Sequence, residues 1–203
     1  MCSTSSRSAL EWDLTYRTIP LSQIPWQSSK PPLSLVYSIS KFKVKSGKAL
    51  DVCCGAGTNS LYLARKGFSV SGIDISSKAI QIAKQRAEKA VLSIDFKVGD
   101  VLDFPYPSSS FNLVVDRGCF HHIKPELREK FVNGIARVLK KNGYYYLQAF
   151  SNVMKLNYGY TFSKQDIRNY FGEKFKILRW GQAVHFEPSG GKVVLRTAFM
   201  RKV

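Results

Sequence analysis

Two glycines, a short polar run and a distant acid stand together between residues 49 and 74. An apolar run, Ala49–Cys53, leads directly into Gly55 and Gly57, and a second apolar run ends on Asp74, 19 positions after Gly55. A glycine carries no Cβ, so a ligand can approach the backbone closely at both positions. A carboxylate at Asp74 can accept hydrogen bonds from both hydroxyls of a ribose. These residues predict a site for an adenosine-type ligand.

The elements around these residues can bring them to one place. The two apolar runs indicate parallel strands, and Leu61–Ala64 between them has helical spacing. A parallel pair needs a crossover, which a helix beginning near Thr58 supplies. The first turn of that helix points unpaired N–H groups at the ligand. The order of strand, glycine loop, helix, strand and acid is typical of half a nucleotide-binding βαβ unit.

The remainder of the chain predicts further units of the same kind. A serine cap, Ser76 or Ser77, begins one helix, and Asn142-Gly143 is interpreted as the end of a later one. The last two strands form a closing hairpin, so we expect a mixed sheet with one antiparallel strand. Helices are predicted over residues 9–18, 33–42, 76–91, 124–143 and 163–171, and later strands over 93–99, 111–115, 144–150, 175–180 and 193–200.

Length and composition predict a single domain over residues 1–203. A chain of 203 residues, 44% of them hydrophobic, is long enough for one buried core and too short for two ordinary domains. The chain has no long apolar run, and Met1–Ser8 lacks the apolar stretch of a secretory signal. We therefore expect no membrane span and a cytoplasmic location. The four cysteines lack metal-ligand spacing, so we expect reduced thiols and no metal.

The chain has a large excess of positive charge. It contains 31 Lys and Arg residues against 14 Asp and Glu residues, which gives a net charge of +17. Such a charge fits an anionic partner such as a nucleic acid. The lysines are distributed along the chain, however, which fits a solvated surface without any partner. We favour the solvated surface and keep a nucleic acid as the alternative.

A nucleotide oxidoreductase is a competing interpretation of the glycine loop. Short-chain dehydrogenases have glycine where this chain has Asp51, and they require a Tyr-x-x-x-Lys pair. Tyr37/Lys41 precedes the glycine loop and Tyr160/Lys164 lies among polar loop residues, so neither pair suits that role. An acid just before Gly-x-Gly instead suits a ligand that carries a cation near the loop.

The segment Ala49–Ser60 resembles the first motif of class I S-adenosylmethionine-dependent methyltransferases. Asp74 resembles their ribose-binding acid, Gly99–Val101 the segment that holds the adenine, and Asp116–Gly118 the strand end whose backbone meets the methionine part. The resemblance spans residues 33–150 and implies a Rossmann-like α/β fold. This fold is a three-layer αβα sandwich whose seven-stranded mixed sheet has the order 3-2-1-4-5-7-6 and an antiparallel last strand. The resemblance also implies that S-adenosylmethionine binds against Asp51, Cys53, Gly55, Ala56, Gly57, Thr58, Asn59, Asp74, Ile75, Ser76, Asp100, Val101, Asp116, Arg117 and Gly118.

Residues 1–32 are expected to form a segment that covers the site. Trp12, Tyr16 and Trp26 in this segment resemble the amino-terminal aromatic residues of thiopurine- and tellurite-type small-molecule methyltransferases. In those enzymes, aromatic residues of this segment cover the cofactor and the substrate. The resemblance implies a substrate or lid role for the three rings, and packing against the core is the alternative.

His121 and His122 follow the fourth strand, at the edge of the sheet where a general base would lie. Adjacent side chains project differently, so we expect at most one of them to face the substrate. A base is needed only for an acceptor that must lose a proton. A loop histidine with a backbone partner is the alternative.

The sequence therefore predicts a methyltransferase that uses S-adenosylmethionine and methylates a small-molecule heteroatom, in a thiol, a metalloid or an aromatic acceptor. Asp116–Cys119 stands where enzymes that methylate amino groups of bases have an Asn/Asp-Pro-Pro-Tyr segment, which disfavours a nucleic-acid acceptor. Three alternatives stay open: a nucleic-acid or protein methyltransferase, which the positive charge favours, a cofactor-binding module without activity, and a nucleotide oxidoreductase.

Overall fold

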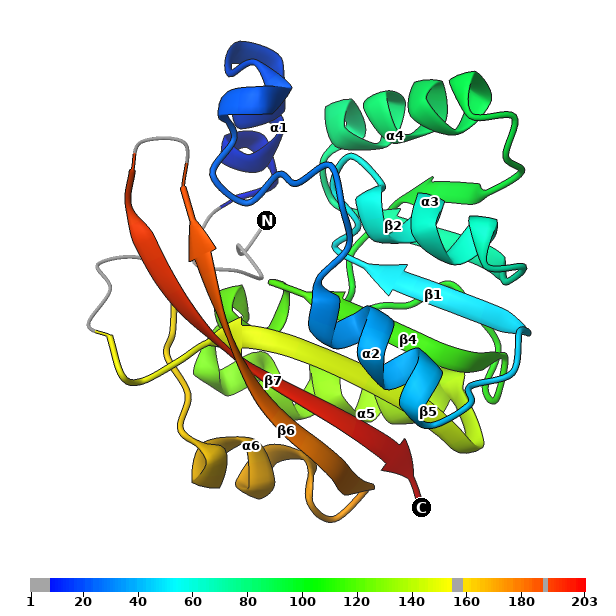
Figure 1. Cartoon of the computed structure of the whole chain (residues 1–203), viewed down its shortest axis with the longest axis vertical. Helices are drawn as coiled ribbons and strands as arrows, with labels where there is room; N and C mark the ends of the chain where they lie inside the picture. The colour runs from blue at the N-terminus through cyan, green and yellow to red at the C-terminus, as the bar shows by residue number, and fades with distance from the viewer. Residues whose placement is uncertain (1–7, 155–158, 188–189) are drawn as a thin grey trace.

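The computed structural model describes residues 8–154, 159–187 and 190–203. In this part of the chain seven strands form one sheet of order β3-β2-β1-β4-β5-β7-β6 (Figure 1). Neighbouring strands from β3 to β5 are parallel, and β7 is antiparallel to both β5 and β6. The predicted order and the antiparallel last strand are confirmed. The strands are β1 (Lys48–Val52), β2 (Ser69–Asp74), β3 (Asp95–Val98), β4 (Phe111–Arg117), β5 (Leu139–Phe150), β6 (Phe175–Phe186) and β7 (Lys192–Lys202).

Helices cover both faces of the sheet because successive strand residues point to opposite sides. Ala49 packs in a core cluster with Leu35 of α2, whereas the next residue, Leu50, packs in a second cluster with Phe131 of α5. No helix in the described residues is long and apolar enough to cross a membrane. One face carries α2 (Leu33–Lys41), α3 (Thr58–Arg65) and α4 (Ser77–Lys89), and the other carries α5 (Arg128–Val138) and α6 (Lys164–Phe171).

The amino-terminal segment lies outside these two layers. Its helix α1 (Ala9–Thr18) begins with a capping box, in which the Ser8 side chain accepts from the Glu11 N–H and the Glu11 carboxylate accepts from the Ser8 N–H. The predicted helix over residues 9–18 is confirmed. Figure 1 shows α1 above the carboxyl ends of the strands, near α4 and near the upper end of the β6–β7 hairpin.

The boundary between α5 and β5 differs from the prediction. We expected Asn142-Gly143 to end the helix, but α5 ends at Val138 and β5 begins at once with Leu139. Asn142 does adopt the positive φ (63°) that suggested a helix end. It does so inside β5, where the register against β4 shifts between Phe111 and Leu113. A left-handed residue marks a β-bulge as readily as a helix end, and sequence alone does not separate the two.

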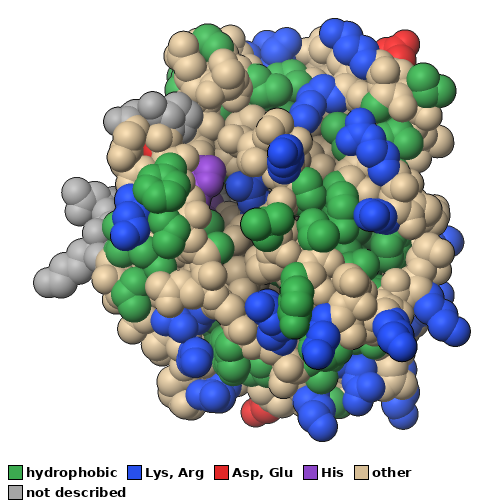
Figure 2. Space-filling model, viewed as in Figure 1, with side chains coloured by type: hydrophobic (Ala, Val, Ile, Leu, Met, Phe, Trp, Pro, Cys, Tyr) green, Lys and Arg blue, Asp and Glu red, His purple; other side chains and the backbone are tan. Residues whose placement is uncertain are grey.

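The surface is even more basic than the net charge suggests. Three of the acids, Asp51, Asp74 and Asp116, are buried at or near strand ends and leave the outer surface poor in carboxylates. Figure 2 shows Lys and Arg side chains spread widely over one face, with few Asp or Glu side chains between them. This distribution agrees with the scattered lysines of the sequence.

Candidate active site

A cavity of about 850 Å³ lies where the carboxyl ends of β1, β2, β4 and β5 meet the amino-terminal segment and the β6–β7 hairpin. Parallel strands end at the same edge of a sheet, so residues distant in sequence meet there. The predicted site residues that line this cavity are Trp12, Tyr16, Trp26, Cys53, Gly55, Thr58, Asn59, Asp74, Ile75, Asp100, Val101, Arg117, Gly118, His121 and His122. The structure thus brings most of the predicted residues together around one space.

Asp74 connects the glycine loop to the start of α4. Its Oδ2 accepts from the Gly55 N–H at 2.8 Å, and its Oδ1 accepts from the Ser76 N–H at 2.9 Å. Burial raises the pKa of this carboxyl, while the backbone N–H groups of Ser76, Gly55 and Ile75 act in the opposite direction. Each carboxylate oxygen retains a second lone pair for a ligand hydroxyl. Gly55 has a φ of +52°, and a Cβ there would lie 2.5 Å from the Tyr16 hydroxyl. The loop therefore requires glycine at this position.

Five predicted cofactor residues lie behind the cavity wall rather than on it. Gly57 is the N-cap of α3, and a Cβ there would meet the ring of Phe96. The Asp51 carboxylate accepts from the Ser60 hydroxyl at 2.6 Å and so holds α3 against β1. Because side chains alternate along a strand, an acid at a strand end can point beneath the site instead of into it. The residues outside the lining are Asp51, Ala56, Gly57, Ser76 and Asp116.

Asp116 on β4 is a second acid near a strand end whose side chain does not line the cavity. Its carboxylate accepts from the Cys119 and Phe120 N–H groups and, at 2.9 Å, from the Tyr145 hydroxyl. Burial raises its pKa to about 7. We predicted that Asp116 binds the cofactor directly or through its backbone carbonyl. Its carboxylate lies in the turn that carries the histidines, so contact through the carbonyl stays the prediction for this residue. The following residue, Arg117, points to the opposite side, lines the cavity and donates to the Trp26 carbonyl.

Burial of Asp51 predicts a specific dependence of stability on pH. Burial raises the pKa of Asp51 from 3.8 to about 6, although the Ser60 hydrogen bond opposes the rise. Between these values the native state binds more protons than the unfolded state, so the free energy of unfolding falls as the pH rises. Asp116, whose pKa is raised to about 7, causes a decline over the same range, so we expect Asp51→Asn to remove only the part that Asp51 contributes. Urea unfolding midpoints of the variant and of the wild type are compared from about pH 4 to about pH 7. The two midpoints should be most similar at the acidic end, where Asp51 of the wild type is protonated and neutral. Parallel curves for the two proteins would contradict the assignment.

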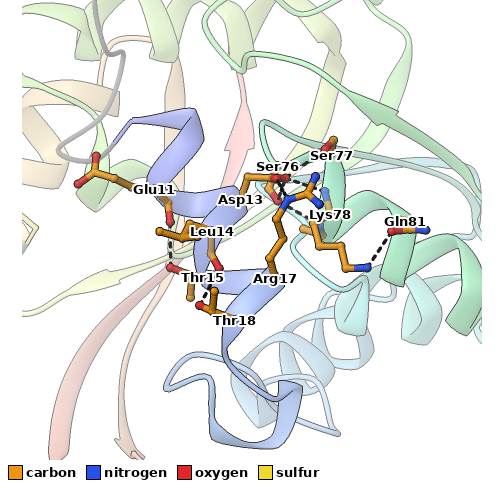
Figure 3. Close-up of polar contacts among 11 residues, drawn as sticks. Glu11, Asp13, Leu14, Thr15, Arg17, Thr18, Ser76, Ser77, Lys78 and Gln81 are labelled. Atoms are coloured by element: carbon orange, nitrogen blue, oxygen red, sulfur yellow. Dashed lines mark hydrogen bonds and ion pairs between the residues drawn. The ribbon is translucent and has the colours of Figure 1, made fainter.

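Asp13 anchors the amino-terminal segment to the start of α4 (Figure 3). Its Oδ1 accepts from the Lys78 N–H at 2.7 Å and from the Ser76 and Ser77 hydroxyls at 2.9 and 3.1 Å. These donors lie at the start of α4, and together with Arg17 they hold the pKa of Asp13 well below its usual value. Figure 3 shows the Asp13 side chain directed from α1 into this helix start. The predicted covering segment thus has a defined anchor.

Three aromatic rings of this segment meet inside the cavity. The Trp26 indole N–H donates to the Tyr16 hydroxyl at 2.9 Å. The Trp12 ring lies edge-on to Trp26 and to His122, with centroids 5.3 and 4.8 Å apart. Tyr16 also packs with Ile24 in a small core cluster. Tyr16 therefore packs against the core and also lines the cavity, and its contact with a cofactor or substrate stays a prediction.

The two histidines differ in their surroundings. His121 is buried, its ring stacks on Phe150 at 3.6 Å, and its Nδ1 accepts from the Phe150 N–H at 3.1 Å. This bond assigns the ring proton to Nε2, and burial, followed by the neighbouring His122, lowers the pKa of His121 well below its usual value. His121 is therefore neutral and has no free nitrogen to accept a proton. His122 is half-buried, lines the cavity and packs against Trp12.

The cysteines differ from the expectation of reduced thiols. Cys53 and Cys119 form a disulfide, with their Cα atoms 5.6 Å apart. Cys53 directly follows β1, and Cys119 comes two positions after the end of β4. Because β1 and β4 are adjacent parallel strands, the two cysteines, 66 positions apart in sequence, lie within disulfide range. Cys54 is free and buried. Cys2 lies outside the described residues.

Several lining residues were not among the predicted ones. The glutamine Gln148 of β5 is buried, and its Oε1 has no hydrogen-bond partner among the described residues. Its neighbours on this wall come from β5, the following loop and the hairpin. These residues are Phe150, Gly159, Tyr160, His185, Glu187, Val193 and Leu195. The expected strand order 5-7-6 could have predicted the lining residues of the hairpin. An antiparallel β7 places the end of β6 and the start of β7 at the same edge of the sheet as the carboxyl ends of the other strands.

Comparisons with known proteins agree with this geometry. A family model described as "Methyltransferase domain" matches residues 49–143. The 2-heptyl-1-hydroxyquinolin-4(1H)-one methyltransferase of Mycobacteroides abscessus is 32% identical over 127 residues, which are 62% of this chain and 56% of that protein. Human EEF1A lysine methyltransferase 2 is 30% identical over 162 residues, which are 75% of this chain and 64% of that protein.

A solved structure is also similar. A SAM-dependent methyltransferase from Methanosarcina mazei superposes with a TM-score of 0.72 at 25% identity, covering 82% of this chain and 98% of that one. The chain spans 56%, 64% and 45% of the lengths of the first three curated relatives, and so matches only part of each.

Proposed function

The chain belongs to the class I S-adenosylmethionine-dependent methyltransferases, and on this premise we propose that it transfers a methyl group to a heteroatom of a small molecule. The family uses S-adenosylmethionine as its cofactor. The observation that carries the proposal is the cavity itself. One continuous space joins the glycine loop to an aromatic chamber under the amino-terminal segment.

The residues on the sheet side of the cavity fit this cofactor. Asp74 has free lone pairs for the ribose hydroxyls, and Asp100 lines the cavity beyond β3, next to the position proposed for the adenine. Asn59 is buried, and its Oδ1 lacks a hydrogen-bond partner among the described residues, so it can accept from a ligand ammonium group. When bound, the cofactor supplies an activated methyl group on a cationic sulfur. The family motif and these partners together support the assignment.

The opposite wall of the cavity suits an acceptor with an aromatic or other apolar body. Trp12, Trp26, Phe150 and Tyr160 line it, together with aliphatic side chains of the β6–β7 hairpin. A His185 ring nitrogen contacts the Pro25 carbonyl, so the hairpin touches the amino-terminal segment across the chamber. Such walls exclude water and orient the acceptor. Alignment of this kind can lower the free-energy barrier to a transfer reaction by about 7–11 kcal/mol.

We assign His122 as the general base for an acceptor that must lose a proton. His121 cannot serve, because its Nδ1 is occupied by the Phe150 N–H. We expect His122→Gln to lower kcat by about 100-fold, the lower end of the usual effect of a general base. The dissociation constant for S-adenosylmethionine should change by less than about threefold, since the residue acts on the acceptor. An unchanged kcat across the pH profile would contradict this role.

The acceptor class is tested by an acceptor screen with labelled methyl. Calorimetry with S-adenosylmethionine first establishes cofactor binding, and panels of thiols, metalloid oxyanions, hydroxylated heteroaromatics, RNA and basic proteins follow. We expect turnover with a small molecule. Two alternatives predict other results: the charge of +17 and the lysine-methylating relative favour a protein or nucleic-acid acceptor, and tight binding without turnover would indicate a binding module. Labelling of RNA or protein alone would overturn the small-molecule assignment.

A further inference from the structure

A second cavity, of about 350 Å³, lies between α3 and α4 and is separate from the space proposed for the methyl acceptor. Its lining includes Ser29, Thr58, Arg65, Arg86 and Lys89. Of these residues only Thr58 also lines the larger cavity. Three cationic side chains and two hydroxyl groups thus surround a small space on the outer side of the glycine loop.

In the part of the chain that the structure describes, no carboxylate forms an ion pair with the positive charges of this pocket. The ion pairs among the described residues join Asp13 to Arg17 and Asp95 to Lys97, and neither pair involves Arg65, Arg86 or Lys89. The described residues that line the pocket include no Asp or Glu. Cations that converge without an acid repel each other, so a bound anion would relieve an unfavourable arrangement.

Arg86 is the fixed member of the group. Its Nη1 donates to the Ala56 carbonyl and to the Thr58 hydroxyl, the latter at 3.2 Å, so the guanidinium is held in place in the lining of the pocket. It is half-buried, and burial, followed by the charge of Arg65, lowers its pKa. A guanidinium that is oriented by the protein and partly removed from water binds an oxyanion more strongly than a freely solvated one.

We propose that this pocket binds a phosphate group. A phosphate offers several strong acceptor oxygens and up to two negative charges, which match two guanidinium groups, one ammonium group and the Ser29 hydroxyl. The Thr58 hydroxyl already donates to the Ser28 carbonyl at 2.8 Å and helps to hold Arg86 in place. A carboxylate has only two oxygens and one charge and leaves part of this donor set unused. The group can belong to free phosphate, to a phosphomonoester or to a phosphodiester backbone, and in each case Arg65, Arg86 and Lys89 provide the contacts.

The test measures phosphate binding to the 203-residue chain, without S-adenosylmethionine, by calorimetry at constant ionic strength. Arg65→Gln/Lys89→Gln removes two exposed contacts and leaves the Arg86 bonds to the glycine loop in place. Lys66→Gln/Lys84→Gln is the matched control, because it removes the same charge from exposed positions beside α3 and on α4 that do not line the pocket. Inorganic phosphate, adenosine monophosphate and a single-stranded RNA oligonucleotide are titrated in parallel to distinguish the sources.

We expect saturable binding of at least one probe to the wild-type protein, with a dissociation constant of about 1 mM or tighter. The pocket variant should bind that probe at least about tenfold more weakly, while the control should stay within about threefold of wild type. Equal weakening in both variants would show that net charge and not this pocket attracts the anion, and absence of saturable binding would also overturn the proposal. Neither result depends on cofactor binding or methyl transfer, so the proposed function is tested separately.

Discussion

Replacement of Asp74 with alanine is expected to weaken binding of S-adenosylmethionine at least about tenfold, which corresponds to about 1.4 kcal/mol. The carboxylate accepts from the Gly55 and Ser76 N–H groups, so it orders the glycine loop before any ligand arrives. It also offers the lone pairs proposed for the ribose hydroxyls. A hydrogen bond to a charged group contributes about 1.5–3 kcal/mol, so the loss of even one such contact explains the expected change.

The protein should remain folded in this variant. Burial raises the pKa of Asp74, which means that the folded state already bears a cost for the charged carboxylate, and alanine removes that cost. Calorimetry gives the affinity, and near-ultraviolet circular dichroism checks the fold. Asp103→Ala, at an exposed position outside the cavity, is the control. Equal affinities in the Asp74 variant and the wild type would remove Asp74 from the cofactor site.

Gly57→Ala is expected to destabilise the protein strongly, by an effect on packing that does not require the ligand. Gly57 has a φ of +78°, and a Cβ there would lie 2.9 Å from the Phe96 ring and 3.2 Å from the Ala83 Cβ. Left-handed backbone costs a residue with a side chain about 1–3 kcal/mol. Overpacking of a filled core adds about 1–3 kcal/mol. The midpoint of urea unfolding should therefore fall well below that of the wild type.

Gly67→Ala separates these two causes. Gly67 has a similar φ of +83°, but the nearest atom to a Cβ there is 3.9 Å away. This variant should bear the backbone cost alone and lose less stability than Gly57→Ala. The same urea titrations compare the two free energies of unfolding. Equal losses would show that the contact with Phe96 is relieved without cost and that only the backbone conformation requires glycine at residue 57.

Local features were predicted well where one physical rule acted alone. The serine-capped helix after Asp74 and the helix over residues 9–18 are present as α4 and α1, because caps and periodic apolar faces act within a few residues. Asn142 was misplaced because its left-handed conformation is compatible with two local structures. The contacts of a neighbouring strand, which lie far away in sequence, decide between them.

The sequence predicted the edge of the sheet at which the candidate site lies more accurately than it predicted which side chains line the cavity. The strand-end rule placed Asp51, Asp74 and Asp116 at one edge of the sheet, yet only Asp74 lines the cavity. Successive side chains of a strand point to opposite faces of the sheet. A shift of one residue in the register of a strand therefore reverses the side to which each of its side chains points. Gln148 gave no signal in the sequence. It lines the cavity because β5 ends beside β4, and the Gln148 Oε1 has no hydrogen-bond partner among the residues that the structure describes.

The sequence by itself determined the βαβ unit, the glycines that the loop requires and the acid that follows the second strand, because spacing and residue type impose these within about 25 residues. Only the tertiary structure decided which acids face the cavity, which histidine accepts a hydrogen bond from the Phe150 N–H and which cysteines meet. Those outcomes depend on side-chain direction and on contacts between distant strands. The pairing of Cys53 with Cys119 and the aromatic chamber under α1 exist only once the sheet has assembled.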